Sequence, residues 1–368
     1  MSSTDVVVIG GGAMGSSAAW QLARRGRSVT LLERFSPGHT HGASHGASRN
    51  FNVSYGDPDH IALLVESLPL WRELEAETGA HLLDQVGIVN HGDFPDIDGV
   101  HESLAAAGIP SEFLPAEEAA RRWPGIRFTT RVLHTPTAGR LNADASVAAL
   151  QRAAAAHGAD VRHDTRVLGI EVIGDDHVRV TTETETIDAR RAIVTAGAWT
   201  SSLLGGIVDL PALVVTQEQP AHFALLDDSF EWPGFNHRPT ATEDDWWYSG
   251  VYGMFTPGEG VKAGWHGTGP VVDPDRRDYT AEPAQAEALR RYAREWLPGA
   301  DADSATWISC TYTTTPDSVF VLDSSGPITV GAGFSGHGFK FTPAVGRVLA
   351  DLTDGRPAPG TFSLQRFA

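Results

Sequence analysis

The 368-residue chain is poor in cysteine and in positive charge, and it has no long apolar run. Its one cysteine, Cys310, excludes a disulfide within the chain and favours a reduced, cytoplasmic setting. The chain has 28 Lys or Arg against 46 Asp or Glu, and its formal net charge of −18 argues against nucleic-acid binding. No run of about 18 apolar residues is present and the N-terminus has no basic region, so we expect neither a membrane span nor a signal peptide.

Metal-ligand spacings and flexible linkers are also absent. None of the 15 His takes part in a spacing such as H-x-x-E-H, so no metal site is predicted. No Ser- or Pro-rich linker divides the chain, although 368 residues is long for one domain. A second domain is therefore expected to be built from insertions into the first.

Apolar periodicity predicts α/β structure early and late in the chain and α+β structure in its middle. The first unit is a strand at 6–9, a helix from Ser16 to about Arg25 that Gly26 ends, and a strand at 28–32. Four further helices are predicted, at 58–79 with a kink at Pro69, 144–157, 282–297 and 343–352. Strands are predicted within 161–180, 186–196 and 318–331, and antiparallel sheet within 217–268.

A glycine fingerprint lies between the first strand and the first helix. Gly10, Gly12 and Gly15 form G-x-G-x-x-G, in which the glycines allow a tight turn, close approach of a pyrophosphate, and helix–strand packing. The free N–H groups at the helix N-terminus favour an anion there. Glu33 lies 23 residues after Gly10, where it can accept a hydrogen bond from a ribose hydroxyl. The sequence therefore predicts a dinucleotide site, and the fingerprint alone does not separate FAD from NAD.

A long polar loop follows this unit, at residues 38–56. It contains Gly-Ala-Ser-His-Gly-Ala-Ser-Arg at 42–49. A nicotinamide-binding Rossmann domain usually continues with helix and strand at this point. The loop therefore favours a large cofactor that extends beyond the sheet.

Two segments near the C-terminus carry further signals. Residues 309–317 read Ser-Cys-Thr-Tyr-Thr-Thr-Thr-Pro-Asp, and their hydroxyl groups and turn argue against a plain apolar strand, although most lone cysteines are buried and inert. Residues 331–340 read Gly-Ala-Gly-Phe-Ser-Gly-His-Gly-Phe-Lys before a helix. So many glycines indicate close approach to an anion or a flavin edge, with a tight structural loop as the alternative.

Together with residues 44–49, 196–199, 251–253 and 262–266, these segments resemble the monomeric sarcosine oxidase family. That family includes N-methyltryptophan oxidase and is one of the D-amino-acid-oxidase-like flavoenzymes. The resemblance covers nearly the whole chain, with little signal in 84–140. It implies an α/β fold: a Rossmann-like FAD-binding domain with an inserted α+β substrate domain built on a mostly antiparallel sheet. The FAD-binding domain would comprise 1–85, 141–215 and 320–368, and the substrate domain 86–140 and 216–319.

The resemblance implies FAD as the cofactor, joined through a thioether to Cys310, which matches the family's flavin-linked cysteine. Arg49 matches an arginine beside the flavin, where positive charge favours the reduced, anionic flavin. The expected FAD-binding residues are Gly10, Gly12, Ala13, Met14, Gly15, Glu33, Arg34, Ser44, His45, Arg49, Val167, Ala196, Gly197, Trp199, Cys310, Gly333, Gly336, His337, Gly338 and Lys340.

Two residues of the 262–266 block match family residues near the flavin. Lys262 matches a lysine that activates oxygen, because a fixed cation stabilises the negative charge that O2 acquires; the alternative is a solvated surface lysine. His266 matches a histidine that helps to bind substrate. On a strand, Lys262, Gly264 and His266 would share one face.

Further matches concern the substrate cavity. Tyr252 and Tyr312 match tyrosines that line it, and Lys340 matches a lysine that pairs with the substrate carboxylate. The family commonly has a second arginine three residues after Arg49, where this chain has Asn52. Because Asn cannot replace a bidentate Arg–carboxylate pair, this departure indicates a larger N-substituted amino acid, an amine without an α-carboxylate, or a carboxylate held elsewhere.

The expected function is oxidation of a secondary amine, an N-methyl or N-alkyl amino acid, to an amine, a carbonyl product and hydrogen peroxide. The expected partners are the amine and O2, and the chain is expected to be a monomer. Alternatives are an oxidase of fructosyl amino acids or cyclic imino acids, a flavin dehydrogenase with another electron acceptor, and a flavin-binding protein without activity. Residues 244–248, Asp-Asp-Trp-Trp-Tyr, would add aromatic surface near the cavity or form an exposed hairpin.

Overall fold

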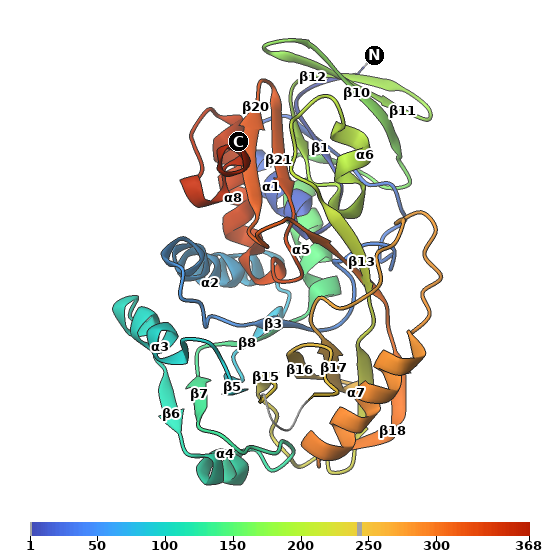
Figure 1. Cartoon of the computed structure of the whole chain (residues 1–368). Helices are drawn as coiled ribbons and strands as arrows, with labels where there is room; N and C mark the ends of the chain where they lie inside the picture. The colour runs from blue at the N-terminus through green and yellow to red at the C-terminus, as the bar shows by residue number, and fades with distance from the viewer. Residues whose placement is uncertain (1, 241–244) are drawn as a thin grey trace.

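The computed structural model describes residues 2–240 and 245–368 and is organised by two eight-stranded sheets, one in the upper and one in the lower half of Figure 1. Among these residues, no helix is long and apolar enough to cross a membrane. The chain passes between the sheets several times, so each sheet collects strands from separate parts of the sequence.

The upper sheet has a parallel centre. Its strands are β1 (Ser2–Ile9), β2 (Val29–Leu32), β9 (Asp160–Arg162), β10 (Val167–Gly174), β11 (His177–Thr182), β12 (Thr186–Val194), β20 (Val321–Ser325) and β21 (Ile328–Ala332). The order is β10-β11-β12-β1-β2-β9, with β21 beside β12 and β20 beside β21. β1, β2, β9, β12 and β21 are parallel, whereas the β10–β11 and β20–β21 pairs are antiparallel. A parallel centre that begins with a strand–turn–helix unit is a Rossmann-like arrangement.

The two faces of β1 belong to two different apolar cores, because successive strand residues point to opposite faces. Val6 and Val8 belong to one core, and Val7 and Ile9 to the other. Four helices pack together in the first of these cores, as Figure 1 shows: α1 (Ala13–Ala23), α2 (Pro58–Thr78), α5 (Ala143–Ala156) and α8 (Thr342–Thr353).

The lower sheet is almost entirely antiparallel. Its strands are β5 (Ile88–Gly92), β6 (Glu112–Leu114), β7 (Val132–Thr135), β14 (Ala221–Leu225), β15 (Gly234–Arg238), β16 (Val251–Thr256), β17 (Gly260–Trp265) and β18 (Ala300–Trp307), in the order β18-β14-β17-β16-β15-β5-β7-β6. Among the strand pairs described in this lower sheet, only β15–β5 is parallel. The amphipathic helix α7 (Pro283–Trp296) covers its core, and α3 (Ile97–Ala106) and α4 (Ala116–Arg122) lie near its other edge. The predicted fold class, α/β with a Rossmann-like domain and an inserted α+β domain on a mostly antiparallel sheet, is confirmed.

Two small sheets lie where the chain crosses between the large ones. One contains β3 (Arg49–Phe51), β4 (Leu83–Asp84) and β8 (Gly139–Leu141), and the other β13 (Val214–Glu218) and β19 (Cys310–Thr314). The remaining elements are α6 (Thr200–Leu204), η1 (Gly197–Trp199), η2 (Phe339–Phe341), η3 (Gly360–Phe362) and η4 (Leu364–Phe367). Arg49 is the first residue of β3 and Cys310 is the first residue of β19, so the small sheets hold both residues between the two large sheets.

Helix boundaries agree with the sequence patterns to within one residue, except for α1. α1 begins at Ala13, three residues before the predicted start, because extended Gly12 (φ −68°, ψ −171°) is its N-cap. α2 continues through Pro69 as one helix. The patterns do not predict α3 and α4, which lie in the segment with little family signal.

Candidate active site

A cavity of about 1300 Å³ lies between the two large sheets. The upper sheet contributes the C-terminal ends of β1 and β2, and the lower sheet contributes residues of β15, β16 and β17. Sites for single small ligands typically measure about 300–1,000 Å³, so this cavity has room for a large cofactor and a substrate. Every site residue named from the sequence lines it except Gly15. In the described residues, no cluster of three or more His, Cys, Asp or Glu could hold a metal ion.

The glycine fingerprint forms the cavity wall at the start of α1. Gly10 has a φ of +101°, and a Cβ on it would lie 2.5 Å from a neighbouring carbonyl oxygen. A Cβ on Gly15 would lie 2.0 Å from the carbonyl oxygen of Gly10, so Gly15 packs helix against turn instead of facing the cavity. No side chain caps α1 at Gly12, and Ala13 N–H donates to Ser44 Oγ at 3.1 Å. Such a helix N-terminus is suited to bind phosphate groups.

Glu33 is held beside the fingerprint at the end of β2. Its carboxylate accepts hydrogen bonds from Gly11 N–H at 2.7 Å and from Phe35 N–H at 2.9 Å, and only 6% of the residue is exposed. These contacts fix the carboxylate at the cavity wall, where a ribose hydroxyl can donate to it.

An ionic contact closes the same end of the cavity. Arg34 forms an ion pair with Asp275 at 2.7 Å, and Trp199 Nε1 donates to the same carboxylate at 2.9 Å. The Arg34 guanidinium also lies 5.4 Å from the Trp199 ring centroid. Arg34 and Trp199 follow strands of the upper sheet, and Asp275 follows β17 of the lower sheet. The contact therefore joins the two halves of the structure. Val167, Ala196 and Gly197 also line the cavity.

Arg49 organises the polar loop that precedes it. Its guanidinium donates to the carbonyl oxygens of Ser48 at 2.7 Å, Ala43 at 3.0 Å and His45 at 2.6 Å. His45 Nε2 is in turn 3.0 Å from the Ser309 carbonyl oxygen. Burial, followed by the Arg49 charge, lowers the pKa of His45 to about 3, so this imidazole is neutral.

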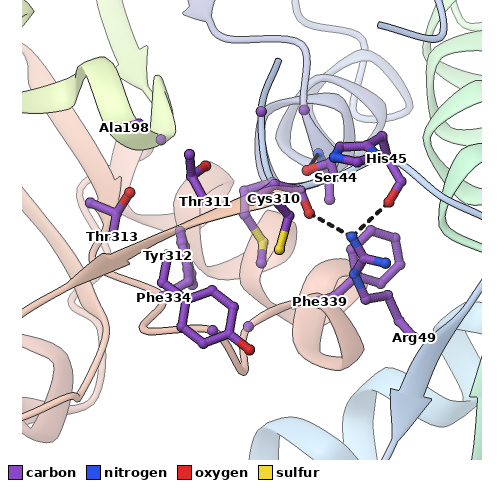
Figure 2. A pocket seen from close by; sticks show the side chains of 18 of the residues that line it. Ser44, His45, Arg49, Ala198, Cys310, Thr311, Tyr312, Thr313, Phe334 and Phe339 are labelled. Atoms are coloured by element: carbon purple, nitrogen blue, oxygen red, sulfur yellow. Dashed lines mark hydrogen bonds between the residues drawn. The ribbon is translucent and has the colours of Figure 1, made fainter. Parts of the chain in front are cut away.

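Cys310 lies at the centre of the cavity wall. Figure 2 shows it between Tyr312 on one side and His45 and Arg49 on the other. It is the first residue of β19, opposite Glu218 of β13, and 8% of it is exposed. Burial raises the pKa of the thiol, and nearby cations oppose that shift.

Three adjacent strands of the lower sheet present one face to the cavity. Side chains on this face form rows across β15, β16 and β17, because residues paired across strands share a face. Met254 and Lys262 form the first row, and Asn236, Tyr252 and Gly264 form the second. All of these residues except Gly264 line the cavity.

Lys262 is the buried cation of this face. It is 3% exposed, and its Nζ lies 3.5 Å from the Ser48 carbonyl oxygen. Burial and then the Arg49 charge lower the pKa of Lys262 to about 7. Its charge therefore responds to small changes in its surroundings near neutral pH.

His266 and two tyrosines form the polar part of the cavity beyond Lys262. Tyr312 Oη and His266 Nδ1 are hydrogen-bonded at 3.3 Å. His266 is exposed to the open cavity, but desolvation by the surrounding protein lowers its pKa to about 4, and the charges of Lys340 and Arg238 add to this effect. Burial also raises the pKa values of Tyr252 and Tyr312. All three groups are neutral near pH 7.

Lys340 is a second buried cation. Its Nζ donates to Tyr55 Oη at 3.0 Å and to the His337 carbonyl oxygen at 2.6 Å, and burial lowers its pKa to about 7. Asn52 lines the cavity, and its Oδ1 accepts from Ser54 N–H at 3.0 Å. Asn52 therefore supplies no charge to assist Lys340.

Residues 245–248 of the predicted aromatic segment 244–248 do not line the cavity. Its first residue lies outside the described part of the chain. Trp246 and Trp247 are partly buried and pack against the apolar core of the lower sheet, with ring centroids 6.3 and 5.8 Å from that of Trp265. Tyr248 is exposed, and residues 245–248 lie in the connection between β15 and β16, which pair antiparallel. The expectation of aromatic surface at the cavity is therefore wrong for these residues, because an apolar pattern does not distinguish a core from a cavity wall.

Sequence reasoning missed several lining residues, among them Tyr55, Asn236, Arg238 and Asp275. Asn236 and Arg238 are two residues apart on one strand, and this alternation of polar side chains was a usable signal. Tyr55 and Asp275 lie in segments without a distinctive pattern, and only the fold brings them to the cavity.

Comparison with known proteins agrees with this geometry. Residues 5–352 match the family described as "FAD dependent oxidoreductase". Monomeric sarcosine oxidase of Bacillus sp. (strain B-0618) is 33% identical over 95% of this chain and 91% of its own length. N-methyl-L-tryptophan oxidase of Yersinia pestis is 28% identical over 99% of both chains. The structure of NikD, "an unusual amino acid oxidase essential for nikkomycin biosynthesis", covers 99% of this chain and 98% of its own, with 29% identity and a TM-score of 0.87. The chain belongs to the FAD-dependent oxidoreductase family.

Proposed function

We propose that the protein is an oxidase of secondary amines, specifically of N-methyl or N-alkyl amino acids. The reaction is R–NH–CH2R′ + O2 + H2O → R–NH2 + R′CHO + H2O2. The observation that carries the proposal is the pairing, in one cavity, of a nucleotide cradle with two buried lysines and a neutral His–Tyr group. The sarcosine and N-methyltryptophan oxidases among the relatives support the same substrate class.

The residues present fit FAD. The start of α1, where Gly12 supplies no side-chain cap, suits the pyrophosphate. Glu33 suits the ribose, and the cavity volume exceeds what a small substrate needs. When bound, FAD supplies the two-electron acceptor for the amine. The chain itself must then bind the amine, keep it unprotonated and help O2 to accept electrons.

Neutral polar groups suit the first of these tasks. His266 is neutral, with Nδ1 bonded to Tyr312, so its Nε2 is available to the substrate amine. Among the described residues that line the cavity, those of β15, β16 and β17 include no Asp or Glu, and neither do the sequence neighbours of His266. The surrounding charges of Lys340 and Arg238 disfavour an ammonium ion, which favours the reactive, unprotonated amine.

Lys262 suits the reaction with O2, since a fixed cation stabilises the negative charge that forms on oxygen. A flavin dehydrogenase would not need this group. The test is peroxide release in air by the purified protein, with sarcosine, N-methyltryptophan and pipecolate. Bleaching of the flavin by an amine without oxygen, but no peroxide in air, would contradict the oxidase and favour a dehydrogenase. A yellow protein that no amine bleaches would contradict both.

In the same proposal, Cys310 carries FAD covalently. It is the only cysteine, it is buried, and it lies at the cavity wall between Tyr312 and His45. Acid precipitation is expected to leave the yellow colour in the pellet, and Cys310→Ser is expected to release it. Colour in the supernatant of the wild-type protein would contradict the link.

The proposed domains follow the two large sheets. Strands of the upper sheet fall within 1–85, 141–215 and 320–368, the proposed FAD-binding domain, and strands of the lower sheet within 86–140 and 216–319, the proposed substrate domain. We further propose that the protein is a monomer and lies in the cytoplasm. Light scattering after gel filtration tests the monomeric state.

A further inference from the structure

A third row on the cavity face of the lower sheet contains Arg238 and His266. Arg238 lies two residues after Asn236 on β15 and therefore points to the same face. Gly250 lies between the two side chains: a Cβ on it would be 3.0 Å from Arg238 Cδ, and its carbonyl oxygen accepts from His266 N–H at 3.1 Å. Because Gly250 has no side chain, the guanidinium and the imidazole face the same space.

Arg238 has no acidic partner in the part of the chain that the structure describes. Its guanidinium lies 5.6 Å from the ring centroid of Phe94, which also lines the cavity. An aromatic ring beneath a guanidinium leaves its planar N–H edge free for an acceptor. The side chain is exposed to the cavity, so a bound molecule can reach it.

The carboxylates that line the cavity are already held elsewhere. Glu33 accepts from Gly11 N–H, Asp144 from Gly46 N–H, and Asp275 pairs with Arg34. Away from Arg34 and Arg166, the positively charged residues that line the cavity are Arg49, Lys262, Lys340 and Arg238. We call this part the substrate half of the cavity. Among the described residues, none of these four cations forms an ion pair with a carboxylate, so in a protein with a net charge of −18 a ligand is expected to supply negative charge here.

We propose that Arg238 is a specificity-determining residue that binds a carboxylate on the part of the substrate remote from the oxidised C–N bond. This inference rests on the proposed amine oxidase function. The substrate class is an N-alkyl amino acid with a second carboxylate, on its side chain or on its N-substituent. The second group is bound bidentately by Arg238, next to His266.

The position of Arg238 on the sheet separates it from the residue proposed for the oxygen reaction. Two residues along a strand span about 6.7 Å, so the Arg238 row lies about 13 Å along the sheet from the Lys262 row. The carboxylate on the reacting carbon is expected at Lys340, so the group that Arg238 binds is a second carboxylate. Its charge offsets the weaker binding that Asn52 leaves at Lys340.

The test compares N-methylglutamate with N-methylglutamine, which have similar shapes but differ in charge. Peroxide release by the wild-type holoenzyme is expected to show at least tenfold higher kcat/KM for N-methylglutamate. Arg238→Gln is expected to abolish this preference through KM, with kcat nearly unchanged, and Arg238→Lys to retain part of it. Arg276→Gln is the matched control, because the Arg276 side chain is 86% exposed and does not line the cavity.

A second measurement is independent of turnover. Glutarate and butyrate, which are not oxidised, are titrated into the holoenzyme while the flavin spectrum is recorded. We expect tighter binding of glutarate, weakened at least tenfold by Arg238→Gln and unchanged by Arg276→Gln.

The outcomes separate this inference from the proposed function. Equal kcat/KM for the two amino acids in the wild type, or equal losses for both in Arg238→Gln, would overturn the role of Arg238 and leave the oxidase in place. If no secondary amine yields peroxide, the proposed function fails, and the glutarate titration alone decides whether Arg238 binds the carboxylate.

Discussion

Replacing Lys262 by methionine is expected to stabilise the folded protein. Burial and the Arg49 charge lower the pKa of Lys262 from 10.5 to about 7. At 1.36 kcal/mol per pKa unit, burying the charged ammonium lowers the free energy of unfolding by about 5 kcal/mol. Methionine has a similar length and no charge, and it loses only the 3.5 Å contact with the Ser48 carbonyl oxygen. We therefore expect the free energy of unfolding at pH 7 to rise by roughly 2–4 kcal/mol.

The effect of pH on this difference has a definite sign. The pKa of Lys262 is lower in the folded protein than in the unfolded chain, so protonation favours unfolding. This destabilisation is complete below about pH 7, decreases between about pH 7 and 10.5, and is absent above. Urea unfolding of wild type and Lys262→Met from pH 6 to 9 measures it. A difference that does not narrow with rising pH, or a variant less stable at pH 7, would refute the reasoning.

The same variant separates the two half-reactions. The rate constant for oxidation of the reduced enzyme by O2 is expected to fall by about 100-fold or more, as for the loss of other fixed charges at a reacting oxygen. Anaerobic reduction by the amine should change only a few-fold. Lys262→Arg keeps the charge and is the control. Equal losses in both half-reactions would exclude a specific role in the oxygen reaction.

Three further predictions concern the substrate half of the cavity. A Cβ at Gly336 (φ +75°) would lie 2.1 Å from the Tyr312 ring, so Gly336→Ala should raise KM several-fold and lower stability by about 1–3 kcal/mol. Gly326→Ala, also at positive φ but with nothing within 4 Å, is its control, and an equal change in KM would contradict the clash. KM for a substrate carboxylate should rise above about pH 7 as Lys340 loses its proton, and Lys340→Arg should remove that rise; a pH-independent KM in the wild type would contradict this. Asn52→Arg should lower KM for sarcosine about tenfold by adding a bidentate partner, and an unchanged KM would show that the carboxylate lies elsewhere.

Local patterns predicted the parts of the fold whose causes are local. Four long helices were placed to within one residue, because the apolar periodicity of a helix is a local pattern. The start of α1 was placed too late, because the last residues of the glycine fingerprint already belong to the first turn of the helix.

The candidate site was predicted as far as its motifs extend. Lys262 and His266 could be placed on one strand face, since strand alternation is a local rule. The row of Arg238, Gly250 and His266 depends on the pairing of three strands, which no spacing in the sequence reports. The aromatic residues at 246–248 were misplaced for the same reason, because packing partners distant in sequence decide whether a tryptophan faces a core or a cavity.

The contact of Arg34 and Trp199 with Asp275 has a consequence for cofactor loading. It joins Arg34 and Trp199, which follow strands of the upper sheet, to Asp275, which follows β17 of the lower sheet, at the nucleotide end of the cavity. We therefore expect the adenosine part of FAD to enter before the contact forms or while it is open. Both partners of the ion pair are partly exposed, with side-chain exposures of 28% and 43%, so dissolved salt weakens it. We therefore expect the apoprotein to take up FAD faster as ionic strength rises. Stopped-flow flavin fluorescence measures this rate, and Asp275→Asn should make it nearly independent of salt.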